Sequence, residues 1–211
     1  MLDQNAFSNS HPPYLACGYI GIEGPGCSGK TTLLKSLIAR HPTLAQVPEY
    51  YELNNCQPFA PPSTVRTPAI QRDVLALLLH LEERRQDIVR EAARQRLLAV
   101  SDRTFLSCIA YDYARSHVEA DIDWRKTERR FSQAEFQPPA LILYLTTPDN
   151  VRSHYADKIG IRKKSMTRHP VFLEMHRAYF EHHVSRRIKT RFVSVQRADA
   201  ILSSLSELVG S

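Results

Sequence analysis

The segment GPGCSGKTT, residues 24–32, stands between the apolar run YIGIE and the helix-like run KTTLLKSLIARH. It has the pattern G-x-x-x-x-G-K-[ST], in which glycines let the backbone turn tightly and point its N–H groups at an anion. A helix that begins at Lys30 directs the positive end of its dipole at the same point. The segment therefore predicts a strand, a loop and a helix that together hold a polyphosphate. The alternative is an ordinary glycine-rich turn.

In this pattern the lysine reaches the β- and γ-phosphates of a nucleotide, and the hydroxyl that follows it ligates Mg²⁺. We therefore expect Mg²⁺ and ATP to be bound, with Lys30 in a catalytic role and Thr31 as a metal ligand. Further contacts to ATP are expected from Gly24, Gly26, Ser28, Gly29 and Thr32, and from Arg152 farther along the chain.

Apolar runs that read as strands alternate with helical patterns along the chain. The strand-like runs are GYIGIE, LAQVPE, LLAVSD, ALILYLTT and RFVSVQ. Helices are expected up to about His41, from about Pro68, through the region of Ala110, after ALILYLTT and over ADAILSSLSELV. This alternation predicts an α/β fold, with a parallel sheet covered by helices on both faces. We expect one domain over residues 17–211 and a loose tail over residues 1–16.

Composition narrows the class of protein. Hydrophobic residues make up 43% of the chain and charged residues 24%, as in soluble globular proteins, and the apolar run VLALLL is far too short to span a membrane. Four cysteines without metal or disulfide spacing suggest reduced thiols in a cytoplasmic protein. The net charge of +6 permits nucleic acid, but the basic residues are spread out and no nucleic-acid module is recognisable. A nucleotide-like small molecule is the expected partner, and a homodimer is left open.

Charged residues follow two of the predicted strands at the edge of the sheet where ligands bind. Asp102 ends LLAVSD, and a carboxylate buried there beside a phosphate loop is expected to hold Mg²⁺. Arg103 is expected to clamp a phosphate, although an internal Asp–Arg pair that caps the next helix is the alternative. Glu49 follows LAQVP and has three open roles: taking a proton from an acceptor hydroxyl, binding a sugar hydroxyl or binding a cation.

The long helix from Pro68 contains an apolar stripe that arginine interrupts. Arg84 and Arg85 stand where the stripe should continue, so at least one of them is expected to face the interior or a cleft, where it needs an anion or a carbonyl group. The alternative is extension to solvent or pairing with a neighbouring glutamate. The stripe consists of Ile70, Val74, Leu77, Leu78, Leu81, Ile88 and Ala92.

Residues 158–169 are basic and contain Gly160 as a hinge, which is typical of a lid that brings positive charge onto the γ-phosphate. The alternative is a solvated basic loop. The lid residues would be Arg162, Lys163, Lys164 and Arg168. His176, His182 and His183 follow on a polar helix without a metal pattern, and we expect them at the surface.

Three segments, IEGPGCSGKTTL, ALLLHLEERRQ and SDRTFLSCIAY, resemble the thymidylate kinase family of nucleoside monophosphate kinases, and more distantly the deoxynucleoside kinases. Weaker similarity extends the resemblance over residues 18–209. It implies a P-loop NTPase fold with a five-stranded sheet in the order 2-3-1-4-5, Mg·ATP as the phosphate donor, and Arg84 and Arg103 on the acceptor nucleotide.

The departures from that family lie on its base and sugar side. Gly26 replaces an acidic loop residue, and VPEYYE replaces Arg-Glu-Pro-Gly-Gly. Thr104 replaces a tyrosine, and Asp112 replaces a glutamine. His80 replaces a phenylalanine that stacks on thymine in that family. We therefore expect a kinase of a nucleotide-like acceptor bound by Glu49, His80, Arg84, Arg103 and Asp112, with a (deoxy)nucleoside monophosphate favoured. A hydroxyl acceptor, such as a nucleoside or a nucleoside-like antibiotic, with Glu49 as base is the alternative. A nucleic-acid-binding ATPase or polynucleotide kinase is more remote.

Overall fold

The structure, a computed structural model, describes residues 18–59, 67–162 and 165–210. Its centre is a sheet of five parallel strands: β1 (Ile20–Glu23), β2 (Leu44–Val47), β3 (Leu98–Asp102), β4 (Leu141–Leu145) and β5 (Thr190–Val193). Their order is β2-β3-β1-β4-β5, which confirms the predicted fold class and strand order. The register pairs Ile22 with Asp102 and Glu23 with Tyr144, so the carboxyl ends of these strands meet at one edge.

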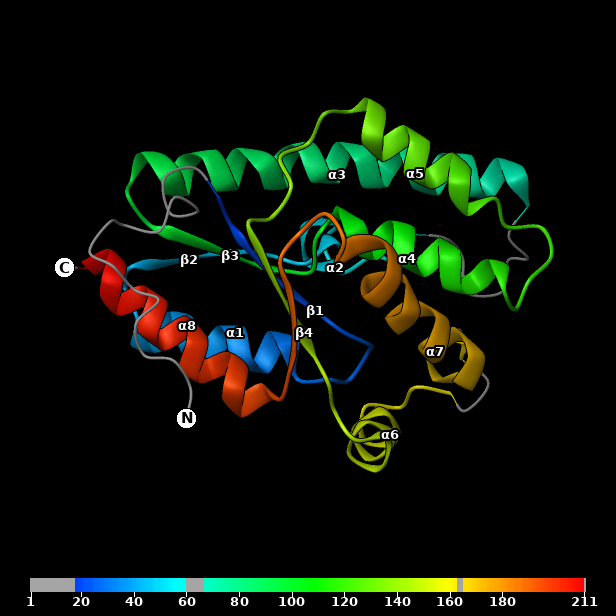
Figure 1. The fold of residues 1–211 in the computed structure, drawn as a ribbon. Coiled ribbons are helices and arrows are strands. Elements are labelled where there is room, and N and C mark those ends of the chain that lie inside the picture. Colours follow the sequence, from blue (N-terminus) through cyan, green and yellow to red (C-terminus); the bar gives the residue numbers. More distant parts are fainter. Residues whose placement is uncertain (1–17, 60–66, 163–164, 211) are drawn as a thin grey trace.

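The central strands are apolar because helices cover both faces of the sheet. Every residue of β1, β3 and β4 is buried. Figure 1 shows α1 (Lys30–Arg40) and α8 (Val195–Gly210) on one side of the sheet, and α3 (Pro68–Arg94), α4 (Phe105–Ser116) and α7 (Pro170–Tyr179) on the other. Three buried apolar clusters fill the space between the helices and the two faces of the sheet.

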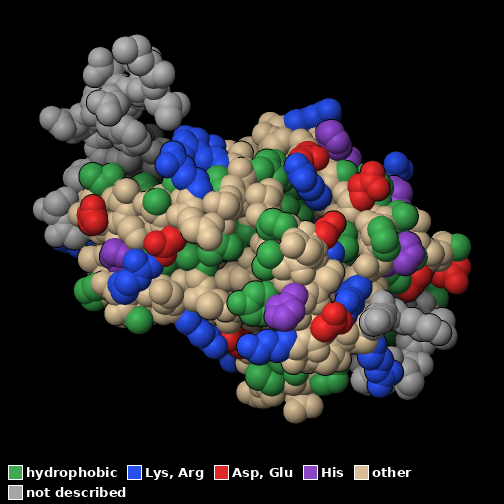
Figure 2. Space-filling view, turned by 90° about the horizontal axis from the view of Figure 1, so that it is seen from below, with side chains coloured by type: hydrophobic (Ala, Val, Ile, Leu, Met, Phe, Trp, Pro, Cys, Tyr) green, Lys and Arg blue, Asp and Glu red, His purple; other side chains and the backbone are tan. Residues whose placement is uncertain are grey.

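Smaller elements complete the fold. The short helix α2 (Tyr50–Leu53) follows β2, α5 (Trp124–Gln133) packs on α4, and α6 (Asp149–Lys158) follows β4. The turn η2 (Met166–Arg168) precedes α7, and the π-helical turn η3 (Phe180–Val184) continues it. None of the described helices is long and apolar enough to cross a membrane. The face that Figure 2 shows carries Lys and Arg side chains scattered among acidic and hydrophobic ones, without a single basic patch.

Capping side chains explain where several helices begin. The Thr67 hydroxyl accepts a hydrogen bond from the Ile70 N–H at 3.3 Å, and Pro68 follows at the first helical position, so α3 begins where the sequence predicts. The strand expected over RFVSVQ ends at Val193, because the Ser194 hydroxyl accepts from the Arg197 N–H at 3.3 Å and α8 begins at Val195. Helix α5 was not predicted from its charged sequence. The expected tail over residues 1–16 lies outside the described residues, as do the expected lid residues Lys163 and Lys164.

Candidate functional site at the phosphate loop

The loop between β1 and α1 has the backbone conformation that its glycines predict. Gly24 and Gly29 adopt φ angles of 135° and 91°, and a Cβ at Gly24 would lie 2.9 Å from the carbonyl oxygen of Leu145. Helix α1 begins directly after the loop, has no side-chain cap and has no acidic residue in its first turn. Its first N–H groups therefore stay available for an anion.

The Lys30 ammonium is folded back onto the loop. Its Nζ donates to the carbonyl oxygens of Gly24 and Pro25 at 3.0 and 2.7 Å and to the Ser28 hydroxyl at 3.1 Å. Burial and the nearby Arg103 charge lower the pKa of Lys30 to about 7. A polyphosphate in the loop would offer this ammonium a stronger partner than neutral carbonyl groups. Thr32, a further expected ATP contact, is exposed at the start of α1.

Asp102 and Thr31 lie together as a metal site requires. The Thr31 hydroxyl donates to Oδ2 of Asp102 at 2.6 Å. The other carboxylate oxygen, Oδ1, is buried and has no hydrogen-bond partner among the described residues, which is costly unless a cation supplies one. Mg²⁺ is commonly held by one or two carboxylates together with phosphates and waters, so these two oxygen-bearing side chains fit it. Within the described ranges, no group of three or more His, Cys, Asp or Glu residues forms an alternative metal site.

Arg103 forms an ion pair with Glu49 at the edge of the sheet. Its Nε donates to Oε1 of Glu49, and its Nη1 donates to the carbonyl oxygen of Gly24 at 3.2 Å. Burial acts to raise the pKa of Glu49, but the Arg103 guanidinium outweighs it and holds that pKa below the ordinary value. The carboxylate is therefore ionised at neutral pH. Arg103 has a φ of 66°, a left-handed conformation that stores backbone strain beside the phosphate loop.

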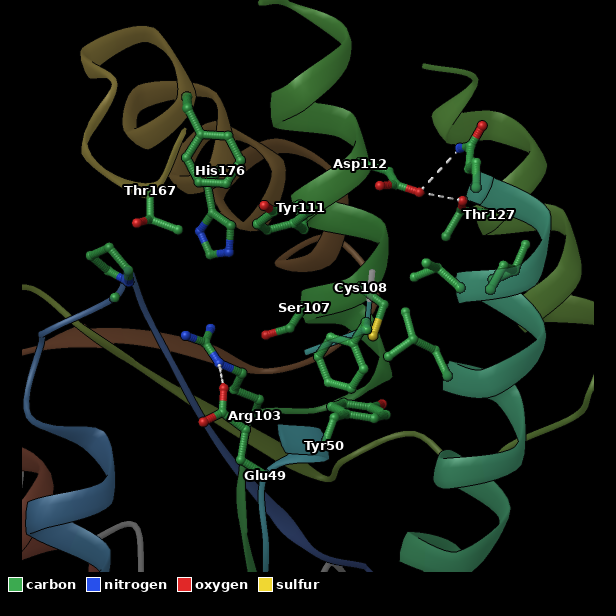
Figure 3. Close-up of a pocket in the computed structure, with 18 residues that line it drawn as sticks. Glu49, Tyr50, Arg103, Ser107, Cys108, Tyr111, Asp112, Thr127, Thr167 and His176 are labelled. Carbon is green, nitrogen blue, oxygen red and sulfur yellow. Dashed lines mark hydrogen bonds and ion pairs between the residues drawn. The ribbon is translucent and has the colours of Figure 1, made fainter. Parts of the chain in front are cut away.

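A cavity of about 290 Å³ opens beside this ion pair. Figure 3 shows Glu49 and Arg103 at one part of it and Asp112 at another, with apolar side chains between them. Asp112 accepts hydrogen bonds from Gln71 at 3.2 Å and from Thr127 at 2.6 Å. An elongated acceptor with an apolar body and polar groups at both ends suits such a pocket. Its lining comprises Pro25, Gly26, Glu49, Tyr50, Phe59, Gln71, Val74, Leu75, Leu78, Arg103, Ser107, Cys108, Tyr111, Asp112, Thr127, Thr167, Phe172 and His176.

Two expected acceptor contacts, His80 and Arg84, lie outside this lining, and both side chains are exposed. His80 Nδ1 is 3.6 Å from a carboxylate oxygen of Glu83, and Arg84 donates to the carbonyl oxygen of Leu53 at 3.3 Å. The expectation that Arg84 faces the cleft is therefore corrected. The arginine that α3 turns inward is Arg85, about 100° farther round the helix.

Arg85 supports the Arg103–Glu49 ion pair by binding the backbone that carries it. It donates from Nη2 to the carbonyl oxygens of Asp102 and Arg103 at 3.2 and 2.5 Å, and its guanidinium lies 4.2 Å from the ring centroid of Tyr50. The Glu82 carboxylate lies 3.7 Å from Nη1 and accepts the Tyr50 hydroxyl at 2.5 Å. Arg85 therefore joins the end of β3 to the start of α2, the two segments that carry the ion pair.

The structure also adds residues that sequence reasoning missed. The expectation that His176 is at the surface is wrong, because its side chain is 3% exposed and lines the cavity. His182 and His183 are exposed, as expected. A signal for His176 was present, since Phe172, His176 and Tyr179 follow the i, i+4, i+7 spacing of a buried helix face. Gln71, Tyr111 and Thr127 line the cavity without having been predicted.

The expected lid lies against the phosphate loop. Gly160 has a φ of 75°, as a hinge glycine permits, and Thr167 lines the cavity close to Gly26. Arg168 pairs with Asp157 at 2.5 Å, while Arg152 is buried and pairs with Asp149 at 3.1 Å. Arg162 is exposed.

Comparison with known proteins identifies the fold. No protein-family model and no curated protein matches the chain. Among solved structures, a thymidylate kinase from Candida albicans, described as having broad substrate specificity, matches with a TM-score of 0.58 and 17% sequence identity. The match covers 90% of this chain and 91% of that one. At this identity the likeness establishes the fold alone.

Proposed function

We propose that this chain, which has the fold of a thymidylate kinase, is an ATP-dependent phosphotransferase acting on a nucleotide-like small molecule. The observation that carries the proposal is the position of the Arg103–Glu49 pair, which stands where the cavity meets the phosphate loop. A donor phosphate in the loop and an acceptor in the cavity would meet at this pair. Such an arrangement supports transfer by bringing the two reactants together.

On the donor side, the N–H groups of the loop and the Lys30 ammonium bind and orient the phosphates of ATP. Thr31 and Asp102 would hold Mg²⁺, which when bound neutralises charge on the β- and γ-phosphate oxygens. Lys30 already donates to the loop carbonyls, so it needs only to exchange those oxygens for phosphate oxygens. Charge that grows on the leaving ADP is then met by groups that are already oriented.

On the acceptor side, the geometry best supports a hydroxyl group. Arg103 is the one Lys or Arg side chain among the described residues that line the cavity, and Glu49 already occupies it. A phosphate on the acceptor would have to compete with that carboxylate, whereas a hydroxyl needs a base beside it. Glu49 would take the hydroxyl proton as the acceptor oxygen bonds to the γ-phosphorus and the bond from that phosphorus to ADP breaks.

A (deoxy)nucleoside monophosphate is the second candidate acceptor. It is favoured by the thymidylate kinase fold and by the guanidinium of Arg103, which has the planar donor geometry that binds phosphate. In this case the acceptor phosphate would displace Glu49 from Arg103, and no base would be needed because the phosphate is already ionised.

Replacing the carboxylate distinguishes the two acceptors. Glu49→Gln should lower kcat about 10²–10⁴-fold for a hydroxyl acceptor, with little change in the KM of ATP. Glu52→Gln is the matched control, because Glu52 lies in the short helix α2 that Glu49 directly precedes, and it does not line the cavity. Turnover would be measured with nucleosides and with deoxynucleoside monophosphates. A small effect of Glu49→Gln on a deoxynucleoside monophosphate would favour the second candidate and reject the base.

A further inference from the structure

His176 is a polar residue in an aromatic cluster, and it borders the cavity. Its ring centroid lies 5.5 Å from that of Phe180 and 6.1 Å from those of Tyr144 and Phe172. Figure 3 shows its imidazole pointing into the cavity toward the Arg103 guanidinium, on the side opposite Glu49.

The two ring nitrogens of His176 have different surroundings. Nδ1 lies 3.1 Å from the buried hydroxyl of Tyr144 on β4. Nε2 has no hydrogen bond to any residue in the described part of the chain. Nε2 is not one of the buried side-chain atoms that lack a partner, so it is open to the cavity, where a polar atom of a ligand can replace water as its partner.

The Tyr144 hydroxyl determines which nitrogen carries the proton. Burial raises the pKa of Tyr144, which therefore keeps its proton, and its one hydrogen bond to a described residue is to His176. Burial and the charges of Arg103 and Lys30 lower the pKa of His176 to about 3, so the ring is neutral and has a single N–H. If Nδ1 carried that hydrogen, the proton of the Tyr144 hydroxyl would be buried without an acceptor. Both groups are satisfied only when Tyr144 donates to Nδ1, which leaves the hydrogen on Nε2.

We propose that the Nε2–H of His176 donates a hydrogen bond to an acceptor oxygen other than the one that is phosphorylated, and that Tyr144 is the positioning residue that fixes this tautomer. The inference rests on the proposed function, because it places the phosphate acceptor in this cavity. It narrows the acceptor to molecules with a second oxygen across the cavity from Glu49, as in a sugar with more than one hydroxyl group.

Kinetics on the full chain test the hydrogen bond. The assay uses Mg·ATP with thymidine, deoxycytidine, deoxyadenosine and deoxyguanosine, and with the analogue of each that lacks the second sugar hydroxyl. His176→Phe should raise the acceptor KM about 5- to 50-fold, the range for losing one hydrogen bond in a buried site, and leave the KM of ATP unchanged. With the wild type, the KM of each analogue should exceed that of its parent nucleoside by a similar factor. With His176→Phe, the KM values of the analogue and of the parent nucleoside should be nearly equal. His182→Phe, at an exposed histidine, is the matched control.

If His176→Phe folds poorly, a second variant still measures the effect of losing the imidazole on acceptor binding. Tyr144→Phe/His176→Phe removes both polar partners, so no buried hydroxyl is left unpaired, and it should show the same acceptor defect as His176→Phe. Tyr144→Phe alone should have a smaller effect of the same kind, because it frees the tautomer without removing the imidazole. An unchanged acceptor KM in the folded double variant, or a raised KM of ATP instead, would overturn the inference while leaving the kinase assignment intact.

The tautomer is measurable without turnover. NMR of the protein with isotope-labelled histidine should show His176 with hydrogen on Nε2 and none on Nδ1, and Tyr144→Phe should perturb that pattern. Hydrogen on Nδ1 in the wild type would overturn the inference even if the enzyme is active. A wild type that neither binds nor phosphorylates any nucleoside of the panel would reject the hydroxyl acceptor, and with it this inference, while a deoxynucleoside monophosphate would remain as the acceptor to test.

Discussion

Replacing Arg85 tests the claim that α3 turns this arginine, and not its neighbour, toward the site. Arg85 is 2% exposed, and the Glu82 carboxylate beside it is equally buried. Arg85→Met would leave that carboxylate without its cation and remove the donor to the carbonyl oxygens of Asp102 and Arg103. Breaking a buried ion pair from one side costs about 3–5 kcal/mol of unfolding free energy.

Arg84→Met is the matched control, because Arg84 is exposed and its change should stay within about 0.5 kcal/mol. For a chain of this size, 1 kcal/mol shifts the Tm by about 2–4 °C, so Arg85→Met should melt roughly 6–20 °C below the wild type. Urea unfolding at an unchanged m-value would give the free-energy difference directly.

A double variant separates the lost pair from lost packing. Glu82→Gln/Arg85→Met removes both charges from the interior and should regain much of the loss of Arg85→Met. The reasoning would be refuted if Arg85→Met lost less than about 1 kcal/mol, or if Arg84→Met lost as much as Arg85→Met.

Three further predictions concern the site. Lys30 has a pKa of about 7 and is mostly neutral at pH 8, so the binding of ATP at this pH should take up close to one proton. Calorimetry in buffers of different ionisation enthalpy should show this uptake for the wild type and not for Lys30→Arg. Equal uptake by both proteins would reject the protonation state assigned to Lys30. Asp102→Asn should lower kcat and weaken the response of turnover to added Mg²⁺, and an unchanged Mg²⁺ titration would leave Asp102 without a metal role. Asp112→Asn should raise the acceptor KM about tenfold or more, while a raised KM of ATP instead would contradict the placement of the acceptor.

The sequence predicts the parts of this structure that are determined locally. Gly24, Gly29, Lys30 and Thr31 lie within one short segment whose glycine spacing and following helix specify its conformation, so the loop could be placed without knowledge of its neighbours. The five strands could be placed because a parallel sheet buries both of its faces and requires continuous apolar runs. The confirmed strand order came from the resemblance to a family, since periodicity does not specify strand order.

The choice between Arg84 and Arg85 shows where periodicity stops being sufficient. Both positions fit a stripe of 3.6-residue period after Leu81, and one residue turns the helix by about 100°. The packing of α3 on the sheet decides between them, and it buries Leu81, Arg85 and Val89. The same rotation leaves His80 at the surface, although its neighbours along the chain are apolar.

His176 shows a different limit. The polar composition of its helix suggested exposure, and its nearest hydrogen-bonding partner, Tyr144, lies 32 residues away in β4. Only the packing of α7 on α4 and its position near β4 bring the two side chains together. A polar side chain in a helical stripe is therefore buried in α7 as it is in α3, where Arg85 takes such a position.

Phosphate transfer from radiolabelled ATP tests the central claim most directly. Wild type and Lys30→Ala would be incubated with Mg²⁺, labelled ATP and a panel of nucleosides and deoxynucleoside monophosphates, and the labelled acceptor would be separated from ATP. The account predicts a labelled acceptor with the wild type and none with a Lys30→Ala protein that melts as a folded chain, because Lys30 meets the charge that grows as the γ-phosphoryl group leaves. Equal labelling by both proteins, or no labelled acceptor from a folded wild type that binds ATP, would contradict it.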